Sequence, residues 1–390
     1  MSAARTRRLL SALVMAALLL PLLQQLFHPV RVGPLGGRAA QPVPPPELTL
    51  AAWVDGRLQG QAAIWANVSF GFRSWLVRLN DELAFRLFGR VKADSLLVGR
   101  DGYLYATASV EAFEGRDFAG EEALEARLRS LVRLQSALAA RGRTLLVVLI
   151  PGKARALPQH LPEERSRPGP RTNRAWLTAR APQAGLNLLD LEPRFQQWSR
   201  AAPWPLYGPH GFHWTVYAAH LGGDAVAREI ERLRGQRLPR LVVDGLELSD
   251  RPRSSDGDAL QGMNLLFRWP SPPLAYPRAR YEDAGATRPD VLAVADSFWW
   301  LFVNEGIARG LFGRTQLWFY YDELHTPGAP VARRDDVDLA RVLEGQDVVV
   351  LMANDSTLAR LGWGFVEDAE DLLTLGRVRP RARLPPVPEG

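Results

Sequence analysis

Two segments of the chain place a polar side chain directly after an apolar run. Ser297 follows the run 291–295, and Asn354 follows the run 347–352. A serine at the tip of a buried strand is placed to act as a nucleophile, and an asparagine amide at a neighbouring tip can stabilise a developing oxyanion. Each residue has an ordinary alternative, because Asp296 and Ser297 also suit a turn and Asn354 also suits the cap of a helix.

A histidine is the base that such a serine would need near neutral pH. Two of the six histidines of the chain, His210 and His213, lie in the segment 210–215. Thr215 can cap a following helix, which puts His213 just before a helix N-terminus. A lone histidine is more often structural, so the pattern makes His213 a candidate base.

The elements that must position these residues follow a regular alternation. Apolar runs typical of buried strands and patterns typical of helices succeed one another after residue 142, with strands expected at 145–150, 186–190, 291–295, 317–321 and 347–352 and helices at 192–200 and 216–234. This alternation predicts an α/β fold with a parallel sheet covered by helices on both faces. Ligands of such sheets bind beyond the carboxyl ends of the strands, where Ser297 and Asn354 fall.

Earlier segments predict further elements. The segment 50–90 is helical in pattern and rich in aromatic residues, and 121–141 is a strong amphipathic helix. Between them, Asp101 and Gly102 separate two β-prone runs and predict a tight hairpin at 96–105.

The N-terminus carries an apolar run, 9–27, that follows Arg5, Arg7 and Arg8. At a rise of about 1.5 Å per residue this run spans about 28 Å, close to the hydrocarbon thickness of a bilayer. Basic residues before such a run stay in the cytoplasm, so the rest of the chain is expected in the periplasm. We favour a single-pass anchor in the inner membrane, and a cleaved signal peptide is the alternative.

These features divide the chain into parts. The expected parts are a cytoplasmic N-terminus at 1–8, an anchor at 9–27, a Pro- and Gly-rich linker at 28–48, the main domain at 49–377 and a flexible tail at 378–390. A Pro-rich linker is a semi-rigid spacer, although an ordinary loop at a domain edge also fits.

Composition excludes several classes of protein. The chain has 390 residues, of which 47% are hydrophobic and 23% charged, so it is neither wholly disordered nor a polytopic membrane protein. It has no cysteine, which excludes disulfides, Cys-ligated metal sites and thiol catalysis. The net charge of +6 comes from scattered arginines without a basic stripe, so we expect no nucleic-acid partner.

Together these segments resemble a known superfamily. Asp-Ser-Phe after a strand at 296–298, Asn-Asp after a later strand at 354–355 and His-Trp before a helix at 213–214 are similar to the motifs of SGNH (GDSL-type) hydrolases. The order of the motifs, with the histidine first, resembles the alginate O-acetyltransferase AlgX/AlgJ-type family. That resemblance covers roughly residues 70–365.

Three segments carry the closer resemblance. The segment 98–105 is similar to the family's Gly-Lys-Asp-Gly-Trp-Leu-Phe, the segment 150–154 to its Pro-Asp-Lys, and the segment 213–215 to its Asp-x-His-Trp-Thr. The resemblance implies an SGNH-type fold and acetyl transfer to an exported cell-surface polysaccharide. It also implies that a membrane acyltransferase partner supplies the acetyl donor, and that neither a metal nor a bound cofactor is needed.

The resemblance also implies roles for the candidate residues. Ser297 would form an acetyl-enzyme, His213 would take its proton and later activate the sugar hydroxyl, and Asn354 with backbone N–H groups would stabilise the oxyanion. Asp296 is counted with the catalytic residues as part of the serine motif. One departure matters, because the family's aspartate two residues before the histidine is Gly211 here.

The carboxylate that normally supports the histidine must then come from elsewhere. Asp190 and Asp224 are candidates that the sequence does not rank. In a serine protease, loss of this carboxylate lowers the rate by about 10⁴. A slow dyad or a chain without catalysis would follow if no acid replaces it.

Four residues are expected to contact substrate. Trp214, Trp299 and Trp300 are three of them. Trp299 and Trp300 belong to an aromatic cluster after the serine, some members of which could stack on a sugar ring, and packing in the core is the alternative. The other members of this cluster are Phe298, Trp318, Phe319, Tyr320 and Tyr321. Lys153, one of two lysines in the chain, follows a strand end and could contact an anionic ligand, unless it is a solvated loop residue.

Two other functions stay open. A chain of the same fold without catalysis would hold glycan in an assembly complex, and Gly211 is the feature that favours it. A carbohydrate acetyl esterase would use Ser297 and His213 with water as the acceptor, and only product analysis separates it from a transferase.

Overall fold

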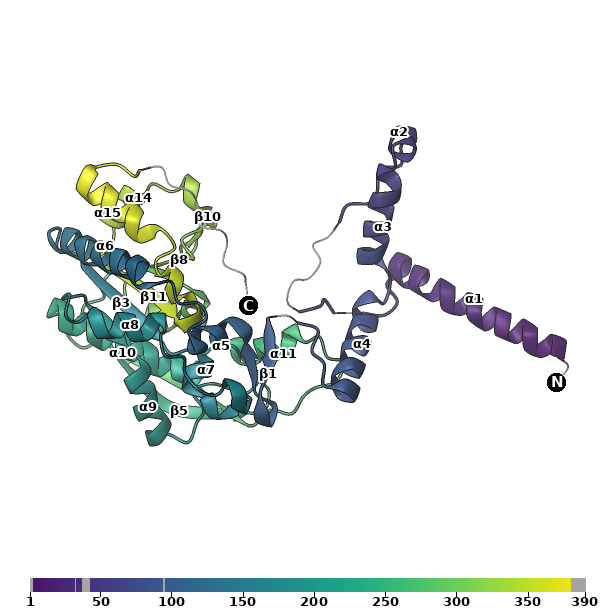
Figure 1. The fold of residues 1–390 in the computed structure, drawn as a ribbon, viewed down its shortest axis with the longest axis horizontal. Coiled ribbons are helices and arrows are strands. Elements are labelled where there is room, and N and C mark those ends of the chain that lie inside the picture. The colour runs from purple at the N-terminus through teal and green to yellow at the C-terminus, as the bar shows by residue number, and fades with distance from the viewer. Residues whose placement is uncertain (1–2, 32, 37–42, 94, 380–390) are drawn as a thin grey trace. The chain divides into compact units, whose positions relative to one another are not determined.

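The computed structural model describes residues 3–31, 33–36, 43–93 and 95–379. The chain divides into two compact units, one comprising Met1–Ala93 with Leu260–Trp269 and the other Asp94–Ala259 with Pro270–Gly390. Figure 1 shows the elements of each. The expected boundaries at 8, 27, 48 and 377 stay predictions, and of the expected tail only residues 378 and 379 lie within the described part.

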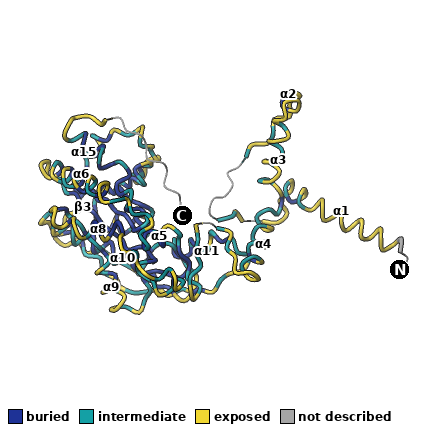
Figure 2. The backbone as a smooth tube through the Cα atoms, viewed as in Figure 1, coloured by how far each residue is buried: buried dark blue, intermediate teal, exposed yellow. Residues whose placement is uncertain are grey.

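The first unit is helical, as the sequence predicted for 9–27 and 50–90. Its helices are α1 (Ala3–Phe27), α2 (Leu50–Val54), α3 (Arg57–Ser69) and α4 (Arg73–Phe88). The part of α1 from Arg5 to Phe27 is long and apolar enough to cross a membrane. Figure 2 shows α1 exposed along most of its length, as expected for a helix whose apolar side chains do not pack into a protein core.

The second unit is built on a seven-stranded sheet with the order β10-β9-β8-β7-β11-β3-β4. All five predicted strands are present and parallel: β3 (Thr144–Ile150), β4 (Leu188–Asp190), β7 (Val291–Ala295), β8 (Thr315–Phe319) and β11 (Val348–Asn354). The antiparallel edge strands β9 (Glu323–His325) and β10 (Ala332–Arg333) were not predicted. The fold is therefore α/β with a mostly parallel sheet, as expected.

Helices cover both faces of this sheet (Figure 1). One face packs against α9 (Glu192–Ala201), α10 (Val216–Arg234), α12 (Trp300–Asn304) and α13 (Ile307–Leu311). The other packs against α6 (Glu121–Ala139), α8 (Asn173–Arg180), α14 (Leu339–Glu344) and α15 (Phe365–Leu375). Strand β3 serves both cores, because alternate side chains point to opposite faces. Its even-numbered residues 146, 148 and 150 lie in the first core and its odd-numbered residues 145, 147 and 149 in the second.

Two antiparallel ribbons complete the second unit. The predicted hairpin is confirmed as β1 (Leu96–Val98) and β2 (Leu104–Ala106), followed by α5 (Thr107–Glu114). The second ribbon, β5 (Arg240–Ser249) with β6 (Leu274–Glu282), was not predicted. The connection between β5 and β6 begins with the segment 250–259, which supplies a residue of the candidate site.

Candidate active site

Ser297 and His213 are in hydrogen-bond contact, although 84 residues separate them in the sequence. Ser297 begins the turn that follows β7, and its Oγ lies 2.7 Å from His213 Nε2. The parallel sheet brings the serine to the carboxyl edge, where the sequence placed it. A hydroxyl hydrogen-bonded to an imidazole nitrogen is the geometry of an activated nucleophile.

The position of His213 depends on the helix that follows it. Thr215 caps α10 as predicted, its Oγ1 accepting a hydrogen bond from the N–H of Ala218 at 3.2 Å. The ring of His213 also packs beside Phe298, with 4.7 Å between the ring centroids. A helix start on one side and an aromatic ring on the other therefore hold the imidazole at the serine.

The carboxylate that the sequence lacked is Asp258, which begins α11 (Asp258–Gly262). Its Oδ2 lies 2.5 Å from His213 Nδ1, and its Oδ1 accepts the N–H of Phe212 at 2.7 Å. A carboxylate accepting from Nδ1 leaves Nε2 unprotonated and able to accept the hydrogen of Ser297. Asp258, His213 and Ser297 thus form a continuous relay.

Neither acid considered from the sequence reaches the histidine. Asp190 pairs with Arg174 and accepts the N–H of Glu192, at the start of α9. Asp224 lies on α10 and pairs with Arg228 at 3.3 Å. Both candidates were wrong, because each is bound to an arginine elsewhere in the fold.

Gly211 explains why the acid is not two residues before the histidine. A Cβ added to Gly211 would lie 2.8 Å from the carbonyl oxygen of Ser255 and 2.9 Å from that of Asp256. Contacts shorter than 3.0 Å with backbone atoms require the backbone to move. The segment that brings Asp258 to His213 therefore occupies the space that a side chain at position 211 would need.

The electrostatic surroundings of His213 favour a base. Burial lowers the pKa of the imidazole, but the hydrogen bond and charge of Asp258 oppose it, and the net effect raises the pKa of His213 above its usual 6.5. The carboxylate of Asp258 therefore favours the imidazolium form of His213.

Asp296 is fully buried and holds the strand tips together. Its Oδ2 accepts the backbone N–H of Asn354 at 2.8 Å, the side-chain amide of Asn354 at 2.7 Å and the hydroxyl of Thr357 at 2.8 Å. Its Oδ1 accepts the N–H of Phe298 at 3.1 Å. Asp296 therefore positions the strand tips next to Ser297 and does not contact the hydroxyl or the imidazole. This corrects the expectation that Asp296 is a catalytic residue.

Asn354 ends β11 and lines the cavity beside Ser297. The predicted cap is also present, since its Oδ1 accepts the N–H of Ser356 at 2.9 Å. One amide hydrogen of Asn354 goes to Asp296. An amide carries two hydrogens, so the cap and an oxyanion contact are compatible.

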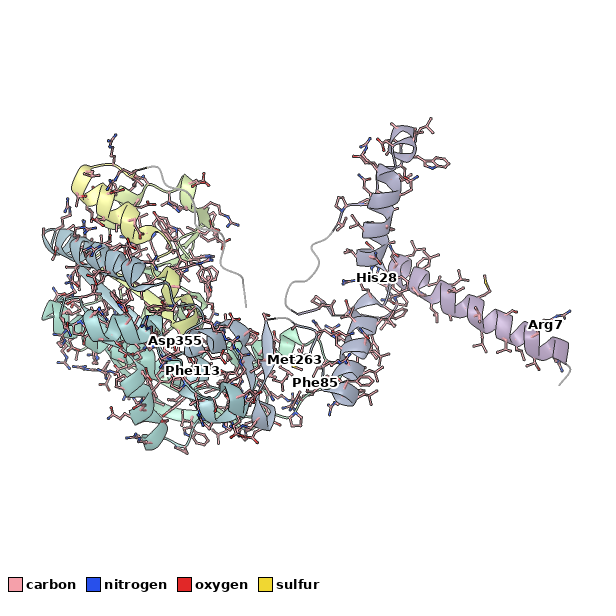
Figure 3. The ribbon with its side chains drawn as sticks, in the orientation of Figure 1. Arg7, His28, Phe85, Phe113, Met263 and Asp355 are labelled. Atoms are coloured by element: carbon pink, nitrogen blue, oxygen red, sulfur yellow. The ribbon has the colours of Figure 1, made fainter. Side chains whose placement is uncertain are left out.

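A buried ionic cluster fixes the adjacent strand ends. Asp355, labelled in Figure 3, accepts hydrogen bonds from Arg174, from Arg155 Nε at 2.8 Å and from the N–H of Gly152 at 3.1 Å. Burial alone would raise the pKa of Asp355, but Arg174 and Arg155 lower it below its usual value. The cluster joins the ends of β11 and β3 at the edge of the sheet where Ser297 lies.

Lys153 is neither a solvated residue nor placed to bind an anion. It is fully buried, and its Nζ donates to the carbonyl oxygens of Leu104 at 2.7 Å, Pro209 at 2.9 Å and Gly211 at 2.8 Å. An ammonium group has three hydrogens, and all three are used. Burial lowers the pKa of Lys153 to about 7. The expected substrate contact was wrong, and Lys153 instead ties β2 to the loop before His213.

The three tryptophans expected to bind substrate pack inside the protein. Trp214 and Trp299 are fully buried, and each packs against Phe302. Trp300 is half-buried, with its ring edge-to-face with those of Phe319 and His325. None of the three lines the cavity at Ser297, so the expected stacking surface was wrong for them.

The cavity at Ser297 has a volume of about 520 Å³. Its walls include Phe298, Phe319 and Tyr320 from the aromatic cluster expected after the serine. They also contain side chains that the sequence did not associate with the site, among them Glu111, Asp117, Arg360 and Trp363. Within the described part of the chain, no group of three or more histidine or acidic side chains is placed to hold a metal ion.

Asp258 was missed because its sequence context gives no signal. It ends a polar segment after β5 that reads as an ordinary loop, and it follows His213 by 45 residues. It lies in the connection between β5 and β6, the two strands of a ribbon that the sequence did not predict.

Comparison with known proteins places this geometry in a family. The model of the SGNH hydrolase-like domain of acetyltransferase AlgX matches residues 96–291. The matched range contains His213 and Asp258 and ends before Ser297. No curated protein matches the chain.

Three solved structures illustrate what the chain is similar to. The O-acetyltransferase domain of Pseudomonas putida AlgJ is 18% identical, with 71% of this chain and 99% of that chain covered and a TM-score of 0.47. Pseudomonas aeruginosa AlgX is 16% identical, with coverages of 71% and 66% and a TM-score of 0.47. Bacillus cereus PatB1 is 13% identical, with coverages of 67% and 96% and a TM-score of 0.42.

The family match spans half of the 390 residues, and the sheet, the helices on both faces and the site at the carboxyl edge fit that family's SGNH-like fold. The chain therefore belongs to the family of SGNH hydrolase-like domains of the acetyltransferase AlgX type.

Proposed function

We propose that the chain O-acetylates a cell-surface polysaccharide through an acetyl-enzyme on Ser297. The observation that carries this proposal is the relay from Ser297 Oγ to His213 at 2.7 Å and from His213 to Asp258 at 2.5 Å. A serine, a base and a carboxylate in this order are the groups that acyl transfer requires. Membership of an acetyltransferase family supports acetyl as the acyl group.

The first step acetylates the enzyme. Ser297 Oγ gives its hydrogen to His213 Nε2 as it bonds to the acetyl carbonyl carbon of the donor. The tetrahedral intermediate then expels the donor's leaving group, which takes the proton from His213. Asp258 stabilises the imidazolium between the two transfers, and Ser297 is left as an acetyl ester.

The second step transfers the acetyl group. A sugar hydroxyl gives its hydrogen to His213 Nε2 and attacks the acetyl carbon of Ser297. The bond between the acetyl carbon and Ser297 Oγ breaks, and the oxygen recovers the proton from His213. The products are an O-acetylated sugar and the original enzyme.

Asn354 is the proposed oxyanion donor in both steps. It lines the same cavity as Ser297, and its amide has one hydrogen beyond the one that Asp296 accepts. Donors held in place before the reaction stabilise developing charge without reorganisation. We propose backbone N–H groups at the strand tips as its partners.

Location and donor supply belong to the same proposal. The apolar helix α1 would anchor the chain in the inner membrane, with the sheet-bearing unit in the periplasm. A membrane acyltransferase would deliver the acetyl group, because the periplasm is separated from the cytoplasmic pool of activated acetyl compounds.

The test uses the full chain in detergent with p-nitrophenyl acetate as donor. We expect a burst of p-nitrophenol and a mass increase of one acetyl group on Ser297, both absent from Ser297→Ala and reduced at least about a hundredfold in His213→Ala. Ser199→Ala, which changes an exposed serine on α9, is the matched control and should behave as the parent. Acetylation that persists in Ser297→Ala would refute the assignment.

Two rivals are separated by the products. An esterase would release acetate only, whereas a transferase forms acetylated glycan when an oligosaccharide is added. The sequence argument for a glycan-binding chain without catalysis was the missing acid at Gly211. Asp258 removes that argument, since it places a carboxylate on His213.

A further inference from the structure

Two aromatic residues that line the cavity at Ser297 are held in an unusual backbone conformation. Tyr320 has a φ of 49° and Trp363 a φ of 47°, both in the left-handed region that bulky residues rarely adopt. Their rings meet edge to face, with 5.3 Å between centroids. Strain of this kind persists where the surrounding structure enforces it, and it gathers at functional sites. We call this pair the aromatic wall.

Two polar groups in the same cavity lack hydrogen-bond partners among the described residues. Trp363 is 5% exposed, and its Nε1–H is buried without an acceptor. Neither carboxylate oxygen of Asp117 has a hydrogen-bond partner within 3.5 Å among the described residues, and burial raises the pKa of Asp117 to about 6 against the opposing effect of the nearby Asn173 side chain. Buried polar groups are normally satisfied, so a donor and an acceptor left open in one cavity point to a ligand that carries both.

Other buried indole groups make this distinction clear. The Nε1–H groups of four further tryptophans also lack partners in the described part of the chain, namely Trp176, Trp214, Trp299 and Trp318. None of these four lines the cavity. Trp363 is thus the one of these five tryptophans that lines the cavity at Ser297.

Charge in the cavity favours one class of sugar. Glu111 on α5 and Asp117 both line it, and neither has an ion pair among the described residues. Besides His213, which is paired with Asp258, the lining has two basic residues, of which Lys153 spends its three hydrogens on backbone carbonyls. Arg360 is the other. Two carboxylates therefore face one guanidinium, and a further carboxylate on the ligand would meet like charge.

We propose that this cavity is an acceptor subsite for a sugar without a carboxylate, either neutral or carrying a free amine. The aromatic wall would contact the apolar face of the pyranose ring, Trp363 Nε1–H would donate to a ring substituent, and Glu111 and Asp117 would accept hydroxyl or ammonium hydrogens. This inference rests on the proposed function for its place in the reaction, and it names the acceptor class. Under this proposal, polymers of uronic acids are not the preferred acceptors.

The test measures binding, so that it does not depend on acetyl transfer. Full-length Ser297→Ala in detergent is titrated calorimetrically with β-1,4-linked tetrasaccharides of glucose, glucosamine and mannuronate. We expect the tighter binder of the glucose and glucosamine tetrasaccharides to bind at least about tenfold more tightly than the mannuronate tetrasaccharide. The first two can donate hydrogen bonds to the carboxylates of the cavity, whereas the carboxylates of mannuronate would meet like charge. Tighter or equal binding of the uronate, or no binding of any tetrasaccharide, would overturn the proposal.

Matched variants in the same background locate the subsite. Glu111→Gln and Asp117→Asn should each weaken the preferred sugar about threefold to tenfold and narrow its advantage over the uronate. Glu122→Gln, at an exposed glutamate on α6, should change neither. If both cavity variants keep the parent's ratio of affinities for the preferred sugar and the uronate, the two carboxylates do not select the sugar. If Ser297 is not acetylated but the protein still prefers the sugar without a carboxylate, the proposed function is refuted and the proposed binding subsite is not.

Discussion

Asp258 shows that a motif can look incomplete when the site is complete. The carboxylate of the family's Asp-x-His pattern is absent at Gly211, yet His213 Nδ1 still has a carboxylate at 2.5 Å. What His213 requires is an acceptor at Nδ1, and its chemistry does not depend on where in the chain that acceptor originates. Gly211 and Asp258 form one arrangement, because the backbone next to Gly211 leads to Asp258.

The pH dependence of activity should report this carboxylate. Only neutral imidazole accepts a proton, so kcat/KM should rise with pH through the pKa of His213, which Asp258 holds above 6.5. Asp258→Asn removes the opposing charge, burial then dominates, and the acid limb should move to lower pH while the rate falls by up to about 10⁴. Ester turnover between pH 5 and 9 measures both, with Asp224→Asn as the control. An unchanged profile in Asp258→Asn would contradict the relay.

Gly211 should be intolerant of even one added carbon. Gly211→Ala places a Cβ within 3.0 Å of backbone atoms of Ser255 and Asp256, so the segment carrying Asp258 must shift. We expect a loss of about tenfold or more in kcat/KM, since small displacements of catalytic groups are costly. Gly262→Ala, where nothing lies within 4 Å, should leave the rate unchanged. Equal rates for the two variants would show that the packing at Gly211 is not needed.

At the scale of secondary-structure elements, three of them meet at Asp355. Arg155 on α7 (Lys153–Ala156) and Arg174 on α8 both donate to its fully buried carboxylate, which directly follows β11. A buried pair is costly to break, because the remaining charge loses its partner. The cluster therefore holds the strand tips in register under the site.

Asp355→Asn should destabilise the fold by up to about 3–5 kcal/mol, because it removes the carboxylate that Arg174 and Arg155 share and leaves Arg174 with Asp190 and Arg155 with Glu192 at 3.8 Å. The folded-state pKa of Asp355 is lowered, so its contribution is present above the usual value near 4 and is lost as pH falls through the lowered pKa. Urea unfolding at pH 7 and pH 3 measures both effects. The difference in the free energy of unfolding between the parent and the variant should be smaller at pH 3 than at pH 7. Asp322→Asn, in an exposed pair with Arg333, should cost less than about 1 kcal/mol.

Local pattern predicts those elements whose stability is local. The run 291–295 and the amphipathic helix at 121–141 were predictable, because the strand buries every side chain and the helix buries apolar residues at regular helical spacing on one face. The ribbon of β5 and β6 was not, since its residues are largely half-exposed and pair across a long connection. Asp258 lies in that connection, so the acid of the site was missed for the same reason as the ribbon. Trp214 and Trp299 were misassigned because the sequence around an aromatic residue near a site does not show whether its ring packs in the core or lines the cavity.

At the scale of the whole molecule, the chain combines an apolar N-terminal helix with the candidate active site of the sheet-bearing unit. Helix α1 is exposed along most of its length (Figure 2), and the sheet-bearing unit has its own two cores. An exposed apolar helix is unfavourable in water, and this one fits a signal anchor or a signal peptide. If the mature protein retains the helix, the sheet-bearing unit stays attached to the membrane, as the proposed supply of acetyl groups requires.

The anchor and its orientation can be tested together, because the chain contains no cysteine. Glu122→Cys adds one thiol to an exposed position of the sheet-bearing unit, and Thr6→Cys adds one to the segment before the apolar run. We expect a membrane-impermeant maleimide to label Glu122→Cys in cells with a permeabilised outer membrane, and to label Thr6→Cys only after lysis, since basic residues hold that end in the cytoplasm. The purified protein should keep the full mass of 43.3 kDa. A mass that lacks the first residues would establish cleavage instead, and the site would then be released from the membrane.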